Sequence, residues 1–193
     1  MGRLKVAVFA SGGGSNLQSL IDASKNEDFP GEISTVISNN SKSYALERAR
    51  IENISDYHIS GVKYPDISEF KDKLISILDS HSINLIVLAG YMKLLPPQVT
   101  EKYRNRIINI HPALLPKHGG KGMYGMNVHN AVIEAGEEIS GATVHFVDEK
   151  FDNGATLIQR TVPVFPDDTA EILAARVLKI EHKILPQAVG MFL

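Results

Sequence analysis

Short runs of apolar residues recur along the chain and are separated by more polar segments. Several runs are rich in β-branched residues and apolar at consecutive positions, which is typical of strands buried on both faces of a parallel sheet. This pattern predicts six strands, at Leu4–Ala10, Ile33–Ser38, Leu85–Ala89, Ile107–Ile110, Ala142–Val147 and Ala155–Val162.

Segments of helical periodicity lie between these runs. We expect helices over Asn16–Lys25, Ser43–Ile51 and Ile67–Leu78, and a last helix after an N-cap at Asp168-Thr169, with a core-facing stripe of Leu173, Val177, Ile180 and Ile184. Strand and helix alternate through about the first 110 residues, so the expected fold is α/β, with a doubly wound, mostly parallel, Rossmann-like sheet. The stretch from 141 to 163 is expected to add two neighbouring strands that pair antiparallel at one edge.

The composition suits one domain spanning residues 1–193, since 44% of the residues are hydrophobic. The formal net charge is −2, so no overall basic field favours nucleic acid or an anionic membrane. The chain has no cysteine, which excludes disulfides and thiolate zinc sites. The N-terminal apolar stretch ends at Ala10, too short for a signal peptide or a membrane span, so we expect a cytoplasmic protein.

A glycine-rich turn, Gly12-Gly-Gly-Ser-Asn16, joins the first predicted strand to the first helix. Backbone N–H groups at a helix start bind anions when glycines allow a close approach. The turn lacks the Gly-Lys-Ser/Thr ending of a P-loop. It also has Leu17 where a dinucleotide site needs a small residue, and no acid in Ser38–Asn40 for a ribose. A phosphate monoester fits better, and a tight structural turn is the alternative.

The loops after Ala10, Ala89 and Ile110 are expected to meet in one crevice, because ligands of doubly wound sheets bind at the carboxyl ends of the strands. Met92, Leu94 and Leu95 follow the second of these strands. They either close the core or form the wall of a site for a flat ligand such as a pterin or nucleobase.

Asn109 and His111 end the apolar run Ile107–Ile110, and Pro112 follows. Residues i and i+2 of a strand point to the same face, with Cα atoms about 6–7 Å apart. An imidazole exchanges protons near pH 7, and a carboxamide donates to an oxygen that gains charge. Because no cysteine and no Gly-x-Ser-x-Gly elbow supplies a nucleophile, the pair predicts direct acyl transfer between two bound substrates. The alternative is a hydrogen-bonded pair that merely closes a strand end.

Asp148, Glu149 and Asp152 follow the strand Ala142–Val147. A carboxylate beside His111 would fix its tautomer and stabilise the imidazolium, although Asp-Asn-Gly is also a common hairpin turn. The seven histidines show no recognised metal-binding spacing, so no metal site is predicted.

Taken together, Gly12–Asn16, Ala89–Leu95, Asn109–Pro116 and His145–Val147 followed by Asp152 resemble the glycinamide ribonucleotide formyltransferases, from about residue 4 to about residue 190. The resemblance implies that Asn109, His111 and Asp152 are catalytic. It assigns the ribonucleotide to Gly14, Ser15, Asn16 and Glu181, of which Glu181 would hold the ribose. It assigns the folate to Met92, Lys93, Leu94, Leu95 and Asn109 and to the loop of Asp148, Glu149, Lys150, Phe151 and Asp152.

The resemblance further implies 10-formyltetrahydrofolate as co-substrate, no metal, small-molecule partners only, and a monomer or homodimer. The N-terminal half would bind the phosphate and the C-terminal half would contribute the folate site. Lys117–Asn127, the flap, is expected to be a flexible glycine-rich cover over the substrates. No arginine in Gly61–Phe70 matches the family residue that meets the glutamate tail of folate, and Lys63 is the candidate in its place.

The implied reaction is attack of the glycinamide amine on the formyl carbon. Asn109 would donate to the oxyanion, and His111, held charged by Asp152, would shuttle protons. A formyltetrahydrofolate hydrolase is expected to carry a further N-terminal domain, and a methionyl-tRNA formyltransferase a further C-terminal one. A non-catalytic nucleotide-sensing module would bind without turnover.

Overall fold

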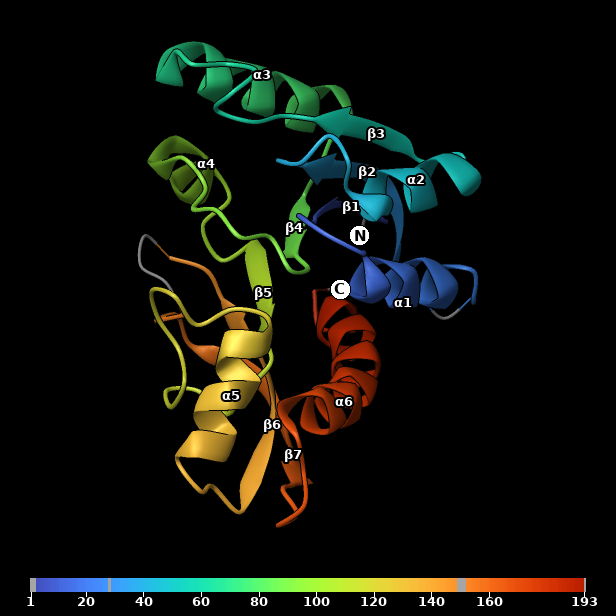
Figure 1. Ribbon diagram of the computed structural model, residues 1–193. Coiled ribbons are helices and arrows are strands. Elements are labelled where there is room, and N and C mark those ends of the chain that lie inside the picture. The colour runs from blue at the N-terminus through green and yellow to red at the C-terminus, as the bar shows by residue number, and fades with distance from the viewer. Residues whose placement is uncertain (1–2, 28, 149–151, 193) are drawn as a thin grey trace.

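A seven-stranded mixed sheet forms the centre of the molecule within the ranges that the computed structural model describes, residues 3–27, 29–148 and 152–192 (Figure 1). The strand order is β3-β2-β1-β4-β5-β6-β7. The strands are β1 (Leu4–Phe9), β2 (Gly31–Ser38), β3 (Ser55–His58), β4 (Leu85–Leu88), β5 (Ile107–His111), β6 (Ile139–Phe146) and β7 (Thr156–Pro163). The helices are α1 (Ser15–Ser24), α2 (Tyr44–Ile51), α3 (Ile67–Ser80), α4 (Pro97–Lys102), α5 (Met126–Glu134) and α6 (Ala170–Gly190).

The predicted fold class is confirmed. The first five strands pair in parallel, β6 pairs antiparallel with β5, and β7 pairs antiparallel with β6 at the sheet edge. The sequence pattern did not indicate β3, α4 or α5. Strand β3 is the four-residue edge segment Ser-Asp-Tyr-His without an apolar run, and α4 has only six residues, too few for a periodic signal.

Alternate residues of the central strands pack into two separate cores. Val6 and Val8 belong to the core covered by α1, α2 and α6, whereas Ala7 and Phe9 belong to the core covered by α3 and α4. All four side chains are fully buried, which explains why β1 is apolar at every position from Val6 to Phe9. Burying a large aliphatic or aromatic side chain contributes about 1.5–3 kcal/mol, so these two cores stabilise the sheet from both faces.

Helix α6 follows the predicted pattern from its first residue. The hydroxyl of Thr169 accepts a hydrogen bond from the backbone N–H of Ile172, which confirms the predicted N-cap. Leu173, Val177 and Ile184 are buried in the core. The helix packs along α1 near the C-terminus (Figure 1), and this contact brings its middle turns next to the glycine-rich turn.

The loops after β1 and β4 meet at the carboxyl edge of the sheet. The chain reverses its direction of winding between these two neighbouring strands. The backbone N–H of Ser11 donates to the carbonyl of Gly90 at 3.0 Å, and the Ser11 hydroxyl accepts from the N–H of Met92 at 2.9 Å. This position is where doubly wound sheets bind their ligands. Among the described helices, none is both long and apolar enough to cross a membrane.

Candidate active site

The glycine-rich turn (residues 12–16) is fixed by a close contact between Gly14 and α2. Gly14 is the N-cap of α1 and has φ of 69°. A Cβ added there would lie 2.8 Å from the Cβ of Ala45, so glycine is required both for the left-handed backbone and for the close approach. The first N–H groups of a helix have no partner inside it, and this arrangement is suited to bind an anion.

Side chains of α2 and its N-cap hold the carbonyl groups of this turn. The Ser43 hydroxyl donates to the carbonyl of Gly12 at 2.7 Å, and the Arg48 Nε donates to the carbonyl of Gly13 at 2.8 Å. With the carbonyl groups occupied on the α2 side, the turn presents its amides, and the guanidinium of Arg48 adds positive charge beneath it.

Asn16 and Glu181 connect the turn to α6. The Asn16 Nδ2 donates to the Glu181 Oε2 at 2.6 Å, and both residues line the cavity described below. Burial raises the pKa of the Glu181 carboxyl, and the hydrogen bond from Asn16 opposes this rise only in part. A buried carboxyl at this place is suited to accept hydrogen bonds from ligand hydroxyls.

A cavity of about 560 Å³ lies between the strand ends, the flap and α6. This volume is typical of small-molecule sites. Met92, Lys93, Leu94 and Leu95 all line it, so they lie where the sequence placed the wall of a flat-ligand site. Lys63 is exposed and is not among the described residues that line the cavity.

Asn109 and His111 both face the cavity from β5, as the strand period predicts. His111 is only 3% exposed. Because a carbonyl oxygen only accepts, the Nε2–H of His111 must donate to the backbone carbonyl of His118, at 2.8 Å. The Nδ1 of His111 then faces the Oδ2 of Asp152 at 3.6 Å, so the structure brings together the three residues that the resemblance named.

Burial and neighbouring charges have opposite effects on the pKa values of His111 and Asp152. Burial lowers the pKa of His111 below its ordinary value and outweighs the Asp152 carboxylate, which raises it. Burial also raises the pKa of Asp152, but contacts with His145, His111 and the Gly120 amide outweigh it, and the net pKa is lowered. The free site therefore favours a neutral imidazole beside a carboxylate, not the charged imidazole that the sequence reading proposed.

His145 on β6 fixes the orientation of Asn109. The Nδ1–H of His145 donates to the carbonyl of Phe146 at 2.8 Å, so its Nε2 is the acceptor in the neutral ring. This Nε2 lies 3.0 Å from the Nδ2 of Asn109 and 3.5 Å from the Oδ1 of Asp152. One N–H of the carboxamide is thereby held, and the carboxamide lies on the cavity.

The sequence motif that contains His145 does not indicate this role for it. The signal that could have found it is the antiparallel register, which pairs Asn109 with His145 and His111 with Thr143. That register depends on which residues of β5 and β6 face each other, and this pairing is not readable from either strand alone.

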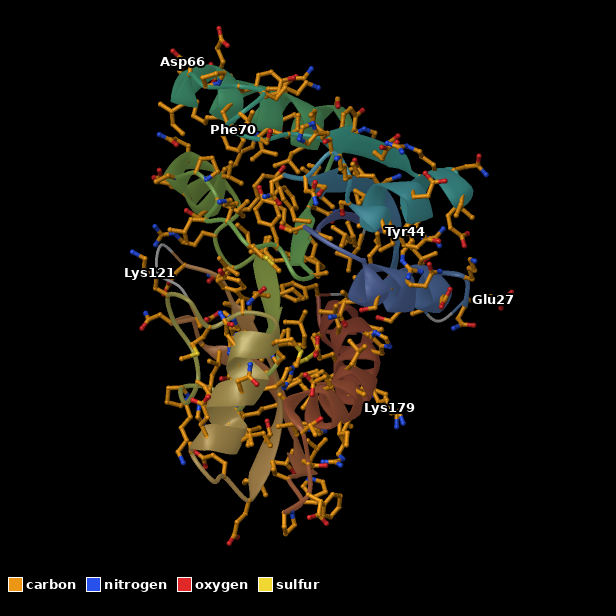
Figure 2. All side chains as sticks on the ribbon, viewed as in Figure 1. Glu27, Tyr44, Asp66, Phe70, Lys121 and Lys179 are labelled. Carbon is orange, nitrogen blue, oxygen red and sulfur yellow. The ribbon has the colours of Figure 1, made fainter. Side chains whose placement is uncertain are left out.

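The predicted flap is partly helical. Its first residues are irregular, and its last two, Met126 and Asn127, begin α5. The backbone N–H of Gly120 donates to the Oδ2 of Asp152 at 2.9 Å, and Lys121 lines the cavity with its side chain labelled in Figure 2.

Three of the predicted folate-loop residues, Glu149, Lys150 and Phe151, lie outside the described residues. Asp148 and Asp152 on either side of them line the cavity. In the part of the chain that the structure describes, no group of three or more histidine and acidic side chains could hold a metal ion.

The fold and this site define a class of enzyme, the formyl transferases, whose family model matches residues 4–189. The chain belongs to this family and, within it, to the phosphoribosylglycinamide formyltransferases, which are folate-dependent enzymes of purine biosynthesis. The enzyme of that name from Haemophilus influenzae is 42% identical over 97% of this chain and 86% of its own length.

Two further relatives extend this similarity. The chloroplastic phosphoribosylglycinamide formyltransferase of Vigna unguiculata is 43% identical over 97% of this chain, which spans 60% of that relative. The crystal structure of glycinamide ribonucleotide transformylase 1 from Geobacillus kaustophilus superposes with a TM-score of 0.92, at 35% identity and over 100% of both chains.

Proposed function

We propose that the protein transfers the formyl group of 10-formyltetrahydrofolate to the amine of N1-(5-phosphoribosyl)glycinamide. The observation that carries this proposal is the position of Asn109, His111 and Asp152 on the same cavity as Asn16 and Glu181. A carboxamide donor and a proton carrier thus share one chamber with Asn16 at the start of α1 and with the hydroxyl acceptor Glu181. That set of groups matches a phosphorylated ribose that carries a nucleophilic amine.

In the proposed arrangement, the phosphate lies on the amides of Gly14, Ser15 and Asn16, and Glu181 accepts hydrogen bonds from the ribose hydroxyls. The support is the helix N-terminus fixed by Gly14 and the hydrogen bond from Asn16 to Glu181. The N-terminal half of the chain would then hold the phosphate of the ribonucleotide, and the amine would point toward β5.

The pterin of the folate lies, in this proposal, against Met92 and Leu94, which are half exposed at the cavity wall. Leu95 is buried behind them. The remaining folate contacts would come from Lys93, from Asp148 and from the loop up to Asp152. Of the two lysines among the described residues that line the cavity, Lys121 stands on the flap and is suited to a carboxylate of the glutamate tail, in place of Lys63.

The proposed reaction begins when the amine attacks the formyl carbon and the formyl oxygen becomes an oxyanion. The other N–H of Asn109 donates to this oxygen, and a donor of this kind is worth about 3–4 kcal/mol. The neutral His111 takes the amine proton on Nδ1, where Asp152 stabilises the imidazolium that forms. When the bond from the carbon to the folate nitrogen breaks, His111 returns the proton to that nitrogen, which gives tetrahydrofolate and the formylated amide.

Holding both substrates in one cavity supplies the remaining rate enhancement, because positioning converts a bimolecular step into a unimolecular one. We also propose that the partners are small molecules alone, without metal, nucleic acid or membrane, and that the enzyme acts in the cytoplasm as a monomer or homodimer. A net charge of −2 is in keeping with this choice of partners.

Release of tetrahydrofolate from 10-formyltetrahydrofolate, measured with and without the ribonucleotide, tests the proposal. We expect release only when the ribonucleotide is present and formylated in equal amount. Release at the same rate without it would show that water is the acceptor, and binding of both ligands without release would show a sensing module. Either result would overturn the proposed transfer.

A further inference from the structure

The backbone of the flap contacts His111 and Asp152, which are called the catalytic pair below. The carbonyl of His118 accepts from the Nε2–H of His111 at 2.8 Å, and the N–H of Gly120 donates to the Oδ2 of Asp152 at 2.9 Å. The residue between them approaches closely, since a Cβ added at Gly119 would lie 3.3 Å from the Cβ of Asp152 and 2.5 Å from a methyl of Leu115. The placement of these few residues therefore sets the geometry of His111 and Asp152.

The chain before this segment is fixed by the sheet. The N–H of Leu115 donates to the Thr143 hydroxyl at 3.2 Å, and the carbonyl of Leu115 accepts from Gln159 at 3.1 Å. These bonds tie the chain to β6 and β7 up to that residue. Beyond it, the next backbone hydrogen bond to the protein body, among the described residues, is the one between the His118 carbonyl and His111.

Glu137 supplies an anchor at this point. Its carboxylate accepts from the Nζ of Lys117 at 3.0 Å and lies 3.2 Å from the Nε2 of His118. The side chain of His118 is 16% exposed and that of Glu137 is 22% exposed, so the pair is largely shielded from solvent. His118 itself has φ of 53°, an unusual value for a histidine that needs support from its surroundings.

The backbone of Glu137 is in turn held by regular structure. Its N–H donates to the carbonyl of Val132 in α5 at 3.3 Å. The adjacent carbonyl of Glu138 accepts from the N–H of Val164, just after β7, at 2.9 Å. Hydrogen bonds from Lys117 and His118 lower the pKa of Glu137, so the carboxylate is charged at neutral pH.

We infer that Glu137 is a positioning residue: through His118 it holds the flap backbone that orients His111 and Asp152 for catalysis. This inference rests on the proposed function, in which His111 carries the proton. Glu137, Lys117 and His118 are not among the described residues that line the cavity. Their loss should therefore slow turnover and leave unchanged the binding of the ribonucleotide, whose proposed contacts lie at the start of α1 and on α6.

The test compares Glu137→Gln with the matched control Glu138→Gln, whose side chain is exposed on the neighbouring residue. We expect Glu137→Gln to lower kcat at least tenfold, because a shift of about 1 Å in a reacting group costs on the order of a hundredfold. The KM for the ribonucleotide should stay within about twofold, a change of only about 0.4 kcal/mol. Glu138→Gln should match the unchanged protein, and thermal unfolding should show that each variant is folded.

A double variant tests whether Glu137 acts through His118. His118→Leu alone should lower kcat, and the double variant with Glu137→Gln should be no slower than the slower single variant. Multiplied effects in the double variant, an unchanged kcat in Glu137→Gln, or a KM that rises as much as kcat falls would each overturn the inference.

Imidazole NMR separates this inference from the proposed function, because it does not depend on turnover. The ring Nε2–H of His111, assigned by its loss in His111→Asn, should exchange slowly in the unchanged protein and in Glu138→Gln. It should exchange quickly in Glu137→Gln. An unchanged signal there would contradict the positioning role, even if the protein proved to transfer the formyl group to a different acceptor.

Discussion

The two ends of the cavity are built differently. At the ribonucleotide end, the glycine-rich turn is a local structure in which Gly14 caps α1 and rests on α2. At the catalytic end, Asn109 and His111 meet His145 and Asp152, which are 36 and 41 residues further along the chain. The turn itself is one strand–turn–helix segment that α2 and Glu181 of α6 support from outside, whereas the second end exists only when three segments are in register.

We expect the largest effect on activity for His111→Asn, which changes the catalytic end of the cavity. Asparagine keeps a polar side chain but cannot take up and release a proton near neutral pH, so kcat should fall about 10²–10⁴-fold. The KM for the ribonucleotide should change little, because the proposed phosphate and ribose contacts lie at the other end. Steady-state kinetics with both substrates would measure this.

His58→Asn is the control for that substitution, since His58 ends β3 on the far side of β2 and β1. It should keep full activity. A loss of less than about tenfold in His111→Asn would show that His111 does not carry the proton.

At the ribonucleotide end, Gly14→Ala should act in the opposite way. A Cβ at this left-handed position costs about 1–2 kcal/mol, and it would also press on Ala45. We expect the KM for the ribonucleotide to rise about tenfold, while the KM for the folate changes little.

Gly61→Ala is the matched control for Gly14→Ala, because a Cβ there meets nothing within 4 Å. It should have no measurable effect. An equal rise in the KM values for both substrates in Gly14→Ala would mean that the two ends of the cavity do not bind their substrates independently.

The same contrast explains what the sequence could predict. Asn109 and His111 lie two residues apart on one strand, and the strand period alone placed both on the cavity. The roles of His145, His118 and Glu137 could not be predicted, because they follow from the register of β6 and from the path of the flap after Leu115.

The protonation state of His111 also could not be predicted from the sequence. Proximity to Asp152 suggested a charged ring, but the degree of burial decides the balance, and burial follows from packing of the whole site. The burial of Glu181 could not be predicted from the sequence either. On α6 it would be taken for a solvated residue, as Lys179 is two positions earlier, where the side chain points outward (Figure 2). Only the contact with α1 makes Glu181 a buried acid.

Glu181→Gln should therefore weaken function and strengthen the fold. Burial raises the pKa of Glu181 in the folded state, so the ionised form costs stability as pH rises through that pKa. Glutamine has no such cost and can still accept from Asn16. We expect the melting temperature of the variant to exceed that of the unchanged protein at pH 8, and the two to converge at pH 4.

The KM of Glu181→Gln for the ribonucleotide should rise, because a neutral amide is a weaker acceptor for ribose hydroxyls than a carboxylate. Glu101→Gln on the exposed end of α4 serves as the control for both measurements. A melting temperature that falls at pH 8 would mean that the charge of Glu181 stabilises the fold.

The smallest effect on activity is expected for Asp168→Asn. This substitution changes neither end of the cavity and tests the contact that holds the start of α6. Asp168 precedes α6 and accepts from Arg176 at 2.5 and 2.7 Å and from the N–H of Phe165 at 2.8 Å. The hydrogen bonds from Arg176 lower its pKa to about 2. Since an unfolded aspartate has a pKa of about 3.9, this interaction stabilises the fold fully above pH 4 and is lost as pH falls toward 2.

Melting temperatures across this range would show the difference. Asp168→Asn should melt below the unchanged protein at pH 7, and the gap should narrow between pH 4 and pH 2. Asp167→Asn, one residue earlier and exposed, should show no such dependence. Because α6 carries Glu181 and packs on α1, a folded Asp168→Asn protein should keep its kcat and show at most a small rise in the KM for the ribonucleotide. A fall in kcat with an unchanged KM would instead place the start of α6 with the catalytic end, and the division into two ends would fail.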